Sequence, residues 1–229
     1  GTFVHVAASY NGSGLATLYV NGESVASDSA MPSPERVTRA LCFFGKDTRG
    51  TDPLFQGRLA EVRIWTTARS VAAIRAGLRG RQDAKESGLL ACYPLDETDD
   101  TTAHDISPNG LHGRLPASIL WGPPGPLALT ALSPPETALW LNGSDAYVEL
   151  PTIDDNLSGG FTLEAWLSLD RVEGAARVIE LGDGPDKHTI ALGITDRAVS
   201  LFVLGSMASA SSTRARPGGA ACRRSRSSS

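Results

Sequence analysis

The side chains best suited to chemistry are two carboxylates that lie in alternating polar and apolar runs, Glu61-Val62-Arg63 and Glu164-Ala165-Trp166. Cleavage of a glycosidic bond uses two carboxylates, one to protonate the leaving oxygen and one to attack. A strand reading Glu-x-Asp-x-(x)-Glu would place them on one face, but Arg63 stands where the second acid is needed. We therefore expect no glycoside hydrolysis of this type and no enzymatic activity.

The histidines do not predict a zinc site. His5, His104, His112 and His188 lack a cysteine or second histidine at the spacing of metal ligands. The sequence also lacks a Gly-x-Ser-x-Gly nucleophile motif, a phosphate-binding loop and a dinucleotide-binding fingerprint. These absences favour a binding or structural protein.

Two tryptophans are the candidate ligand-binding residues. Trp65 and Trp166 lie on the charged sides of their strands, where an indole ring can stack on a sugar ring. The alternative is that both rings pack between strands or in the core.

Short strands separated by turns account for most of the chain. Val71, Ile74 and Leu78 recur at helical spacing after the capping residue Ser70 and predict one short helix over 71–76. Asn21-Gly22 is a strong hairpin signal because both residues tolerate positive φ. Strands are expected at 2–10, 16–20, 23–26, 39–45, 57–65, 89–95, 138–141, 146–150, 161–169, 177–182, 188–194 and 198–204. This pattern predicts an all-β, antiparallel sandwich or jelly roll.

The strand at 57–65 shows the alternation most clearly. Leu59, Glu61, Arg63 and Trp65 are expected on one face, and the small or branched residues between them on the other. The branched face suits a buried sheet surface, and the charged face suits a surface or a site.

Charge is unevenly distributed along the chain. Residues 213–229 contain five arginines and no acid, so the remaining chain carries a net charge of −9 against −4 for the whole. An acidic body argues against nucleic acid as the main partner. The Arg/Ser-rich end is expected to be disordered, and weak attachment to polyanions is the alternative.

The three cysteines do not form a disulfide framework. Cys42 and Cys92 lie in apolar runs and are expected to be buried free thiols, with a bridge between them as the alternative. Neither a membrane-spanning apolar run nor a signal peptide is present in this sequence.

Six runs of residues carry one further signal. They are Phe3-Val4-His5-Val6-Ala7, Leu18-Tyr19-Val20-Asn21-Gly22, Phe55-Gln56-Gly57 through Glu61-Val62-Arg63-Ile64-Trp65, Leu90 to Glu97 with Asp105 to Gly113, Leu141 to Val148, and Phe161-Thr162-Leu163-Glu164-Ala165-Trp166. Together these runs resemble the laminin G-like, concanavalin A-like jelly-roll family, although Phe3 stands where that family usually has tryptophan. The resemblance implies an antiparallel β-sandwich and covers most of residues 2–205.

The order of these runs predicts an unusual domain organisation. Residues 1–80 resemble the second half of such a domain, 81–87 a linker, 88–207 the first half of a following domain, and 208–229 a disordered tail. The chain therefore resembles a piece of a tandem array. Either the two halves close into one sandwich in circularly permuted order, or each remains an incomplete half with exposed strand edges. We favour the first because an uncovered apolar sheet face is costly.

The resemblance also implies a calcium ion at the rim of the sandwich. Glu61 and Asp145 are the candidate ligands carried over by position, because loop acids and carbonyl oxygens suit calcium. The alternative is that Asp145 caps its own turn and Glu61 pairs with Arg63.

These observations predict a non-catalytic, extracellular or cell-surface module that binds a glycan or an extracellular protein, with calcium as a possible cofactor. Neighbouring repeats of the same chain are the other expected partners. A structural spacer repeat is the alternative function, and a glucanase-type enzyme is the third.

Overall fold

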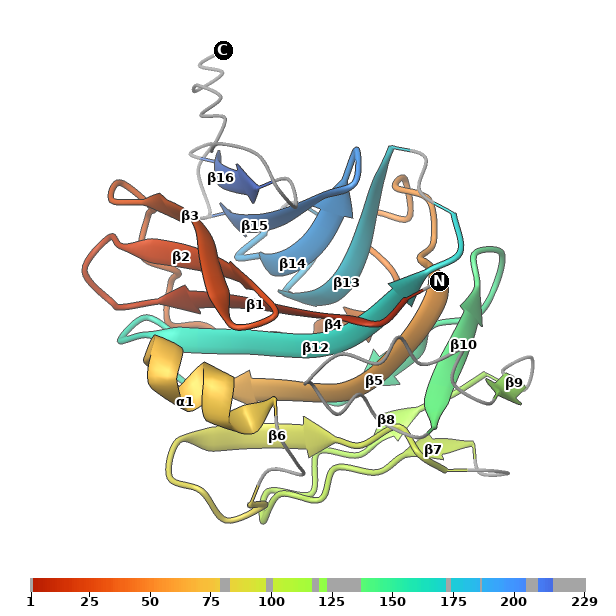
Figure 1. The fold of residues 1–229 in the computed structure, drawn as a ribbon. Coiled ribbons are helices and arrows are strands. Elements are labelled where there is room, and N and C mark those ends of the chain that lie inside the picture. Colours follow the sequence, from red (N-terminus) through yellow and green to blue (C-terminus); the bar gives the residue numbers. More distant parts are fainter. Residues whose placement is uncertain are drawn as a thin grey trace.

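A computed structural model describes residues 2–78, 83–97, 101–116, 120–122, 137–171, 174–185, 187–204 and 210–215. They form two antiparallel β-sheets that pack face to face, with one short helix outside them (Figure 1). Sheet 1 contains β1 (Val4–Tyr10), β2 (Ala16–Val20), β3 (Glu23–Asp28), β5 (Gln56–Trp65), β6 (Leu89–Tyr93), β9 (Leu120–Gly122), β10 (Ala138–Asn142) and β12 (Phe161–Leu169). Sheet 2 contains β4 (Leu41–Phe44), β7 (Thr102–Ala103), β8 (Gly113–Arg114), β11 (Val148–Leu150), β13 (Ala175–Gly182), β14 (Ile190–Thr195), β15 (Ala198–Leu204) and β16 (Ala210–Ala215). The predicted all-β sandwich is confirmed.

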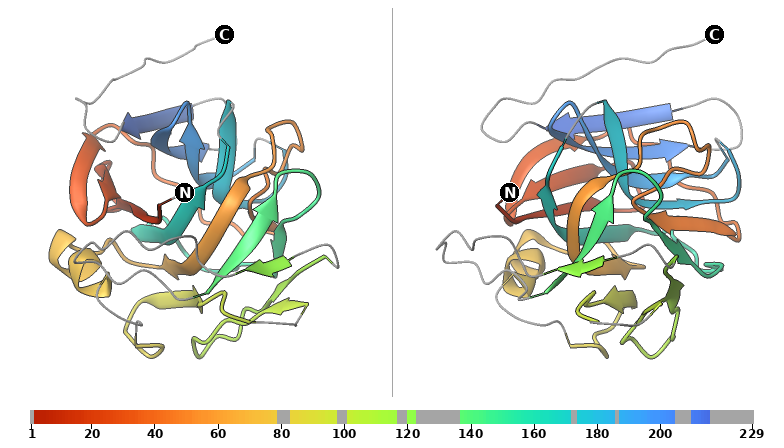
Figure 2. Two further views of the ribbon diagram at one scale, coloured as in Figure 1. Left: turned by 45° about the vertical axis from the view of Figure 1, so that its right-hand side comes forward. Right: turned by 90° about the vertical axis from the view of Figure 1, so that its right-hand side faces the viewer.

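Strands from distant parts of the sequence alternate within both sheets. Sheet 1 has the order β3-β2-β1-β12-β5-β10-β9, with β6 also paired to β5. Sheet 2 has the order β16-β15-β14-β13-β4-β11-β8-β7. Strand β12 therefore lies between β1 and β5, and β4 lies between β13 and β11. The two segments that resemble half-domains thus share both sheets (Figures 1 and 2).

The core consists of apolar side chains from the facing surfaces of the two sheets. Sheet 1 contributes every second residue of β12, including Phe161, Leu163 and Leu167, and sheet 2 contributes residues such as Phe44 and Ile179. All five are at least 98% buried. Cys42 and Cys92 are buried free thiols, as expected from their apolar surroundings.

A β-bulge at Glu61 changes the predicted faces of β5. Glu61 has a positive φ of 45°, and the β5–β12 register skips between Glu164, which pairs with Arg63, and Trp166, which pairs with Ala60. Because the bulge inserts an extra residue, Leu59 faces the core and Ala60 faces outward, the reverse of strict alternation. The expectation that Leu59 shares a face with Arg63 and Trp65 is wrong for this reason.

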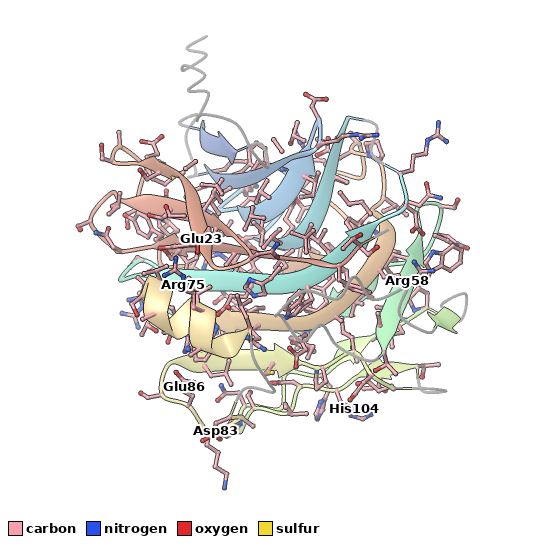
Figure 3. The ribbon with its side chains drawn as sticks, viewed as in Figure 1. Glu23, Arg58, Arg75, Asp83, Glu86 and His104 are labelled. Carbon is pink, nitrogen blue, oxygen red and sulfur yellow. The ribbon has the colours of Figure 1, made fainter. Side chains whose placement is uncertain are left out.

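Helix α1 (Val71–Gly77) covers the outer face of sheet 1. Its N-cap is Ser70, whose Oγ accepts a hydrogen bond from the Ala73 N–H at 3.2 Å. Arg75 of the helix donates to Glu23 of β3 at 2.6 Å, and the two side chains point toward each other in Figure 3. The helix predicted at 71–76 is confirmed.

The chain end differs from its predicted disorder at one place. Residues 210–215 form β16, which pairs antiparallel with β15. The free edge of β15 offers a row of backbone donors and acceptors that an adjacent segment can satisfy whatever its composition. The rest of the predicted tail, and Cys222 with it, lies outside the described residues. In the described part of the chain, no helix has the length and apolar character needed to cross a bilayer.

Candidate functional site

The outer face of sheet 1 is closed by α1. Ile74 of the helix packs against Ala7 and Tyr19, and Leu78, just after the helix, packs against Ala60 and Trp166. Arg63 of β5 donates two hydrogen bonds to the carbonyl oxygen of Gly77, at 3.2 and 3.1 Å. A cation on the last carbonyls of a helix also complements the helix dipole. Figure 2 shows α1 lying against the sheet from two further directions.

Beneath the helix, a carboxylate is buried among cationic side chains. Oε2 of Glu164 lies 3.3 Å from Nε2 of His5 and 3.8 Å from Nη1 of Arg63, and Oε1 lies 3.7 Å from Nε of Arg69. Burial by itself raises the pKa of Glu164, but the hydrogen bond and charge of His5 and the charges of Arg63 and Arg69 outweigh it and lower that pKa. Glu164 is therefore a structural anion that joins the sheet to its covering segments.

Trp65 and Trp166 belong to this covered face and not to the surface. Their side chains are 0% and 1% exposed. The guanidinium of Arg69 lies 3.7 Å from the Trp65 ring centroid, and His5 contacts Trp166 edge-on at 5.4 Å. Neither ring offers a free face for stacking, so the packing alternative describes both residues.

The two acids expected at a calcium site are each paired within the protein. Glu61 accepts a hydrogen bond from Nη2 of Arg63 at 2.8 Å. Asp145 accepts one from Nδ2 of Asn142 at 2.7 Å, within the turn that joins β10 to β11. Asn142 pairs with Gln56, five residues before Glu61 on β5, so the two acids lie at different heights of the sandwich. Among the described residues, no group of three or more His, Cys, Asp and Glu side chains is arranged to hold a metal ion.

The outer face of sheet 2 carries a different set of side chains, which we call the transverse row. Register pairs run directly across the sheet: Phe202 to Ala191, Ala191 to Glu180, Glu180 to Phe43, Phe43 to Glu149, Glu149 to Arg114, and Arg114 to Thr102. The row crosses seven neighbouring strands, from β15 to β7. With strands about 4.8 Å apart, it extends over about 29 Å.

Cations lie over the aromatic rings of this face. Nζ of Lys46 is 4.1 Å from the Tyr147 centroid and 5.0 Å from that of Phe43, and the two rings meet edge to face. At the other end, the Arg177 guanidinium lies 4.3 Å from the Phe202 centroid. Tyr147, Phe202 and Lys46 are half-buried, so part of each is accessible to solvent.

The carboxylates of the face are held by hydrogen bonds from its own loop and strands. Oε1 of Glu180 accepts the Thr48 N–H at 2.7 Å, and Oε2 lies 3.1 Å from Nε of Arg177. Nη2 of Arg177 also lies 3.0 Å from Asp52. Burial is the largest influence on the pKa of Glu180 and raises it, despite the Thr48 hydrogen bond and the Arg177 charge. Glu149 and Arg114 form an exposed ion pair further along the row.

Sequence reasoning missed the transverse row completely. Each of its residues comes from a different strand, and only the pairing of strands far apart in sequence aligns them. The available signal was the alternation within single strands, such as the outward position of Phe202 in β15.

Comparison with known proteins points to the same fold class. Residues 1–75 match the family model Laminin_G_3, described as the concanavalin A-like lectin/glucanases superfamily. Searches of curated proteins and of solved structures gave no match to the chain. The matched region spans β1 to β5 and most of α1. Strands β1, β2, β3 and β5 belong to sheet 1, where they flank β12 on both sides, and β4 belongs to sheet 2, where it lies next to β13. Residues 1–75 of the 229 are thus similar to this superfamily, and the two-sheet antiparallel sandwich is consistent with its jelly-roll fold.

Proposed function

We propose that the chain is a non-catalytic, lectin-like module that binds a carbohydrate across the outer face of sheet 2. The superfamily supports a lectin-like binding module or a spacer in general. The observation that carries the more specific proposal is the transverse row together with Tyr147, which packs against its Phe43. The half-buried rings of Phe202 and Tyr147 and the charged side chains of Glu149 and Arg114 lie along this face.

The chemistry of the row suits an extended saccharide. Aromatic side chains offer apolar contact area to the C–H faces of sugar rings, and Arg, Lys and Glu side chains offer donors and acceptors to hydroxyl groups. Lys46, Arg114 and Arg177 are balanced by Glu149, Glu180 and Asp52, so the face is nearly neutral and favours an uncharged glycan. A length of about 29 Å accommodates several sugar rings.

The outer face of sheet 1 supports a non-catalytic function. Its two carboxylates, Glu61 and Glu164, both lie near Arg63, and Glu164 is buried under α1. A glycosidase needs one such group as an acid and the other as a nucleophile or base at an accessible bond. We accordingly expect no release of reducing sugar from β-glucans.

A glycan array followed by calorimetry tests the proposal. We expect binding of at least one neutral oligosaccharide, and a loss of affinity of about tenfold or more for Tyr147→Ala and for Phe202→Ala, since each removes one aromatic contact. Val71→Ala on α1 and Leu15→Ala in the β1–β2 turn are matched controls, because these apolar side chains are 38% and 42% exposed and neither residue belongs to the transverse row. If all four variants bound the glycan with the affinity of the wild-type protein, the outer face of sheet 2 would not be the binding site. A failure to bind any glycan would leave the spacer function.

Two further parts of the proposal rest on the resemblance. We propose that the module acts outside the cell or at its surface, next to similar repeats. We also propose that calcium binds at the rim near Asp145, whose exposed carboxylate lies in the β10–β11 turn between the sheets.

A further inference from the structure

Three of the five asparagines stand in Asn-x-Ser tripeptides. These are Asn11-Gly12-Ser13, Asn142-Gly143-Ser144 and Asn156-Leu157-Ser158, and proline is absent from the middle of each. This tripeptide is the acceptor sequence for N-linked glycosylation in secreted proteins. The structure distinguishes the three sites from one another.

Asn11 and Asn156 present exposed carboxamides with a free nitrogen. Oδ1 of Asn11 accepts the N–H groups of Ser13 and Leu15, at 2.9 and 3.0 Å. Oδ1 of Asn156 accepts the N–H and Oγ–H of Ser158, at 3.1 and 2.6 Å. Within the described residues, neither Nδ2 atom donates a hydrogen bond, and both side chains belong to exposed residues. The oxygen of each amide is therefore fixed by the chain while its nitrogen remains available.

Asn142 has both ends of its amide engaged. Its Nδ2 donates to Asp145 at 2.7 Å, and its Oδ1 accepts the N–H groups of Ser144, Asp145 and Ala146. The residue is also half-buried. The nitrogen of Asn142 is thus already engaged in the hydrogen bond that closes the turn, unlike the nitrogens of Asn11 and Asn156.

The two available asparagines lie at the same end of the sandwich. A Cβ atom added to Gly12 would lie 2.4 Å from the carbonyl oxygen of Gly159, so the β1–β2 turn rests on the loop that precedes β12. Asn142 lies at the other end, because it pairs with Gln56 at the start of β5, whereas Trp65 at the end of β5 pairs with Thr162. The length of β12 separates the two ends.

We propose that Asn11 and Asn156 each carry an N-linked glycan and that Asn142 does not. In this step, Nδ2 attacks the anomeric carbon of a lipid-pyrophosphate-linked oligosaccharide. The new N–C bond forms as the bond from that carbon to the pyrophosphate oxygen breaks, Nδ2 loses one proton, and the lipid pyrophosphate leaves. The inference rests on the proposed extracellular location and does not depend on glycan binding by sheet 2.

The test is site mapping on the whole chain, expressed behind a secretion leader in a mammalian cell line. Intact mass is measured before and after treatment with peptide N-glycosidase, on both retained and exported protein, so that occupancy is scored independently of export. We expect two glycans, with one lost in Asn11→Gln and one lost in Asn156→Gln. Asn142→Gln should leave the number unchanged.

The hydroxyl of Ser158 provides a matched pair of variants. Ser158→Ala should remove the glycan at Asn156, and Ser158→Thr should retain it, although both change the same surface position. A protein that carries no sugar, or one modified at Asn142, would overturn the proposal. Glycan binding by sheet 2 is assayed on the bacterially expressed, unmodified chain, so failure of one proposal is distinguishable from failure of the other.

Discussion

Nε2 of His5 lies 3.3 Å from Oε2 of Glu164, and both side chains are buried beneath α1. His5 comes from β1 and Glu164 from β12, strands that are neighbours in the sheet but more than 150 positions apart in sequence. Arg63 of β5 and Arg69, in the segment between β5 and α1, contact the same carboxylate. One anion thus connects four parts of the chain that sequence alone does not relate.

Glu164→Ala should strongly destabilise the protein. Removing one partner of a buried ion pair leaves the other charges uncompensated and costs about 3–5 kcal/mol. Urea unfolding followed by circular dichroism measures the loss. Glu149→Ala, which removes the acid of an exposed ion pair with Arg114, is the control and should change the midpoint little. Equal effects of the two variants would contradict the role assigned to Glu164.

The contribution of Glu164 to the free energy of unfolding should disappear in acid. Its pKa is lowered in the folded state from the ordinary 4.5, so the unfolded chain binds the extra proton first as the pH falls. The stabilisation is therefore complete above pH 4.5 and is lost as the pH falls through the lower, folded pKa. The difference in unfolding free energy between wild type and Glu164→Gln should shrink over that range. A difference that stays constant down to pH 3 would refute this assignment.

The contribution of Glu180 to the free energy of unfolding should depend on pH in the opposite direction. Burial raises its pKa above 4.5 in the folded state, so folding favours the protonated form. Its contribution is fully present below pH 4.5 and is lost as the pH rises through the folded pKa. Glu180→Gln should therefore gain stability relative to wild type between pH 4 and pH 7, as measured by urea midpoints at several pH values. A relative loss of stability over the same range would show that Arg177 and Thr48 outweigh burial.

Cys42 and Cys92 should resist alkylation in the folded protein. Burial raises the pKa of Cys42 to about 12 and that of Cys92 to about 11, so few thiolates exist near neutral pH. Iodoacetamide treatment at pH 8 followed by peptide mapping should show both residues unmodified, and both modified in urea. Rapid labelling of either one under native conditions would indicate that its strand opens.

Calcium binding is tested most directly at Asp145. If the rim holds an ion, titration with millimolar calcium should release heat from wild type and less from Asp145→Ala. Asp154→Ala is a suitable control, because this exposed acid accepts a hydrogen bond from Thr38 in another loop. If calcium released no heat from the wild-type protein, the proposed calcium site near Asp145 would be wrong.

The local pattern predicted the strands better than the surfaces. The ranges 16–20, 161–169 and 198–204 agree with β2, β12 and β15 to the residue. The bulge at Glu61 was not predictable, because it depends on the pairing of β5 with β12 on one side and with both β6 and β10 on the other. A period of two identifies residues that share a face, but it does not reveal when a bulge reverses that face.

Trp65 and Trp166 show why the candidate site could not be predicted in the same way. Both do lie on a charged face, as expected, yet that face is covered by α1 and its flanking segments. The charges beside them, Glu164, Arg63 and Arg69, are buried partners of one another and not solvent-exposed groups. The sandwich instead presents accessible rings on sheet 2, where residues from seven strands meet only after the chain has folded.

The position of β12 between β1 and β5 also has a consequence for how the protein forms. Closing sheet 1 requires a strand about a hundred residues downstream of β5 to enter between two strands that precede it in the sequence. Pairings at such separation raise the contact order, which slows folding. During synthesis, the edges of β1 and β5 are complete well before their shared partner emerges. Until then they are open to pairing with other chains, so refolding yield should fall as protein concentration rises.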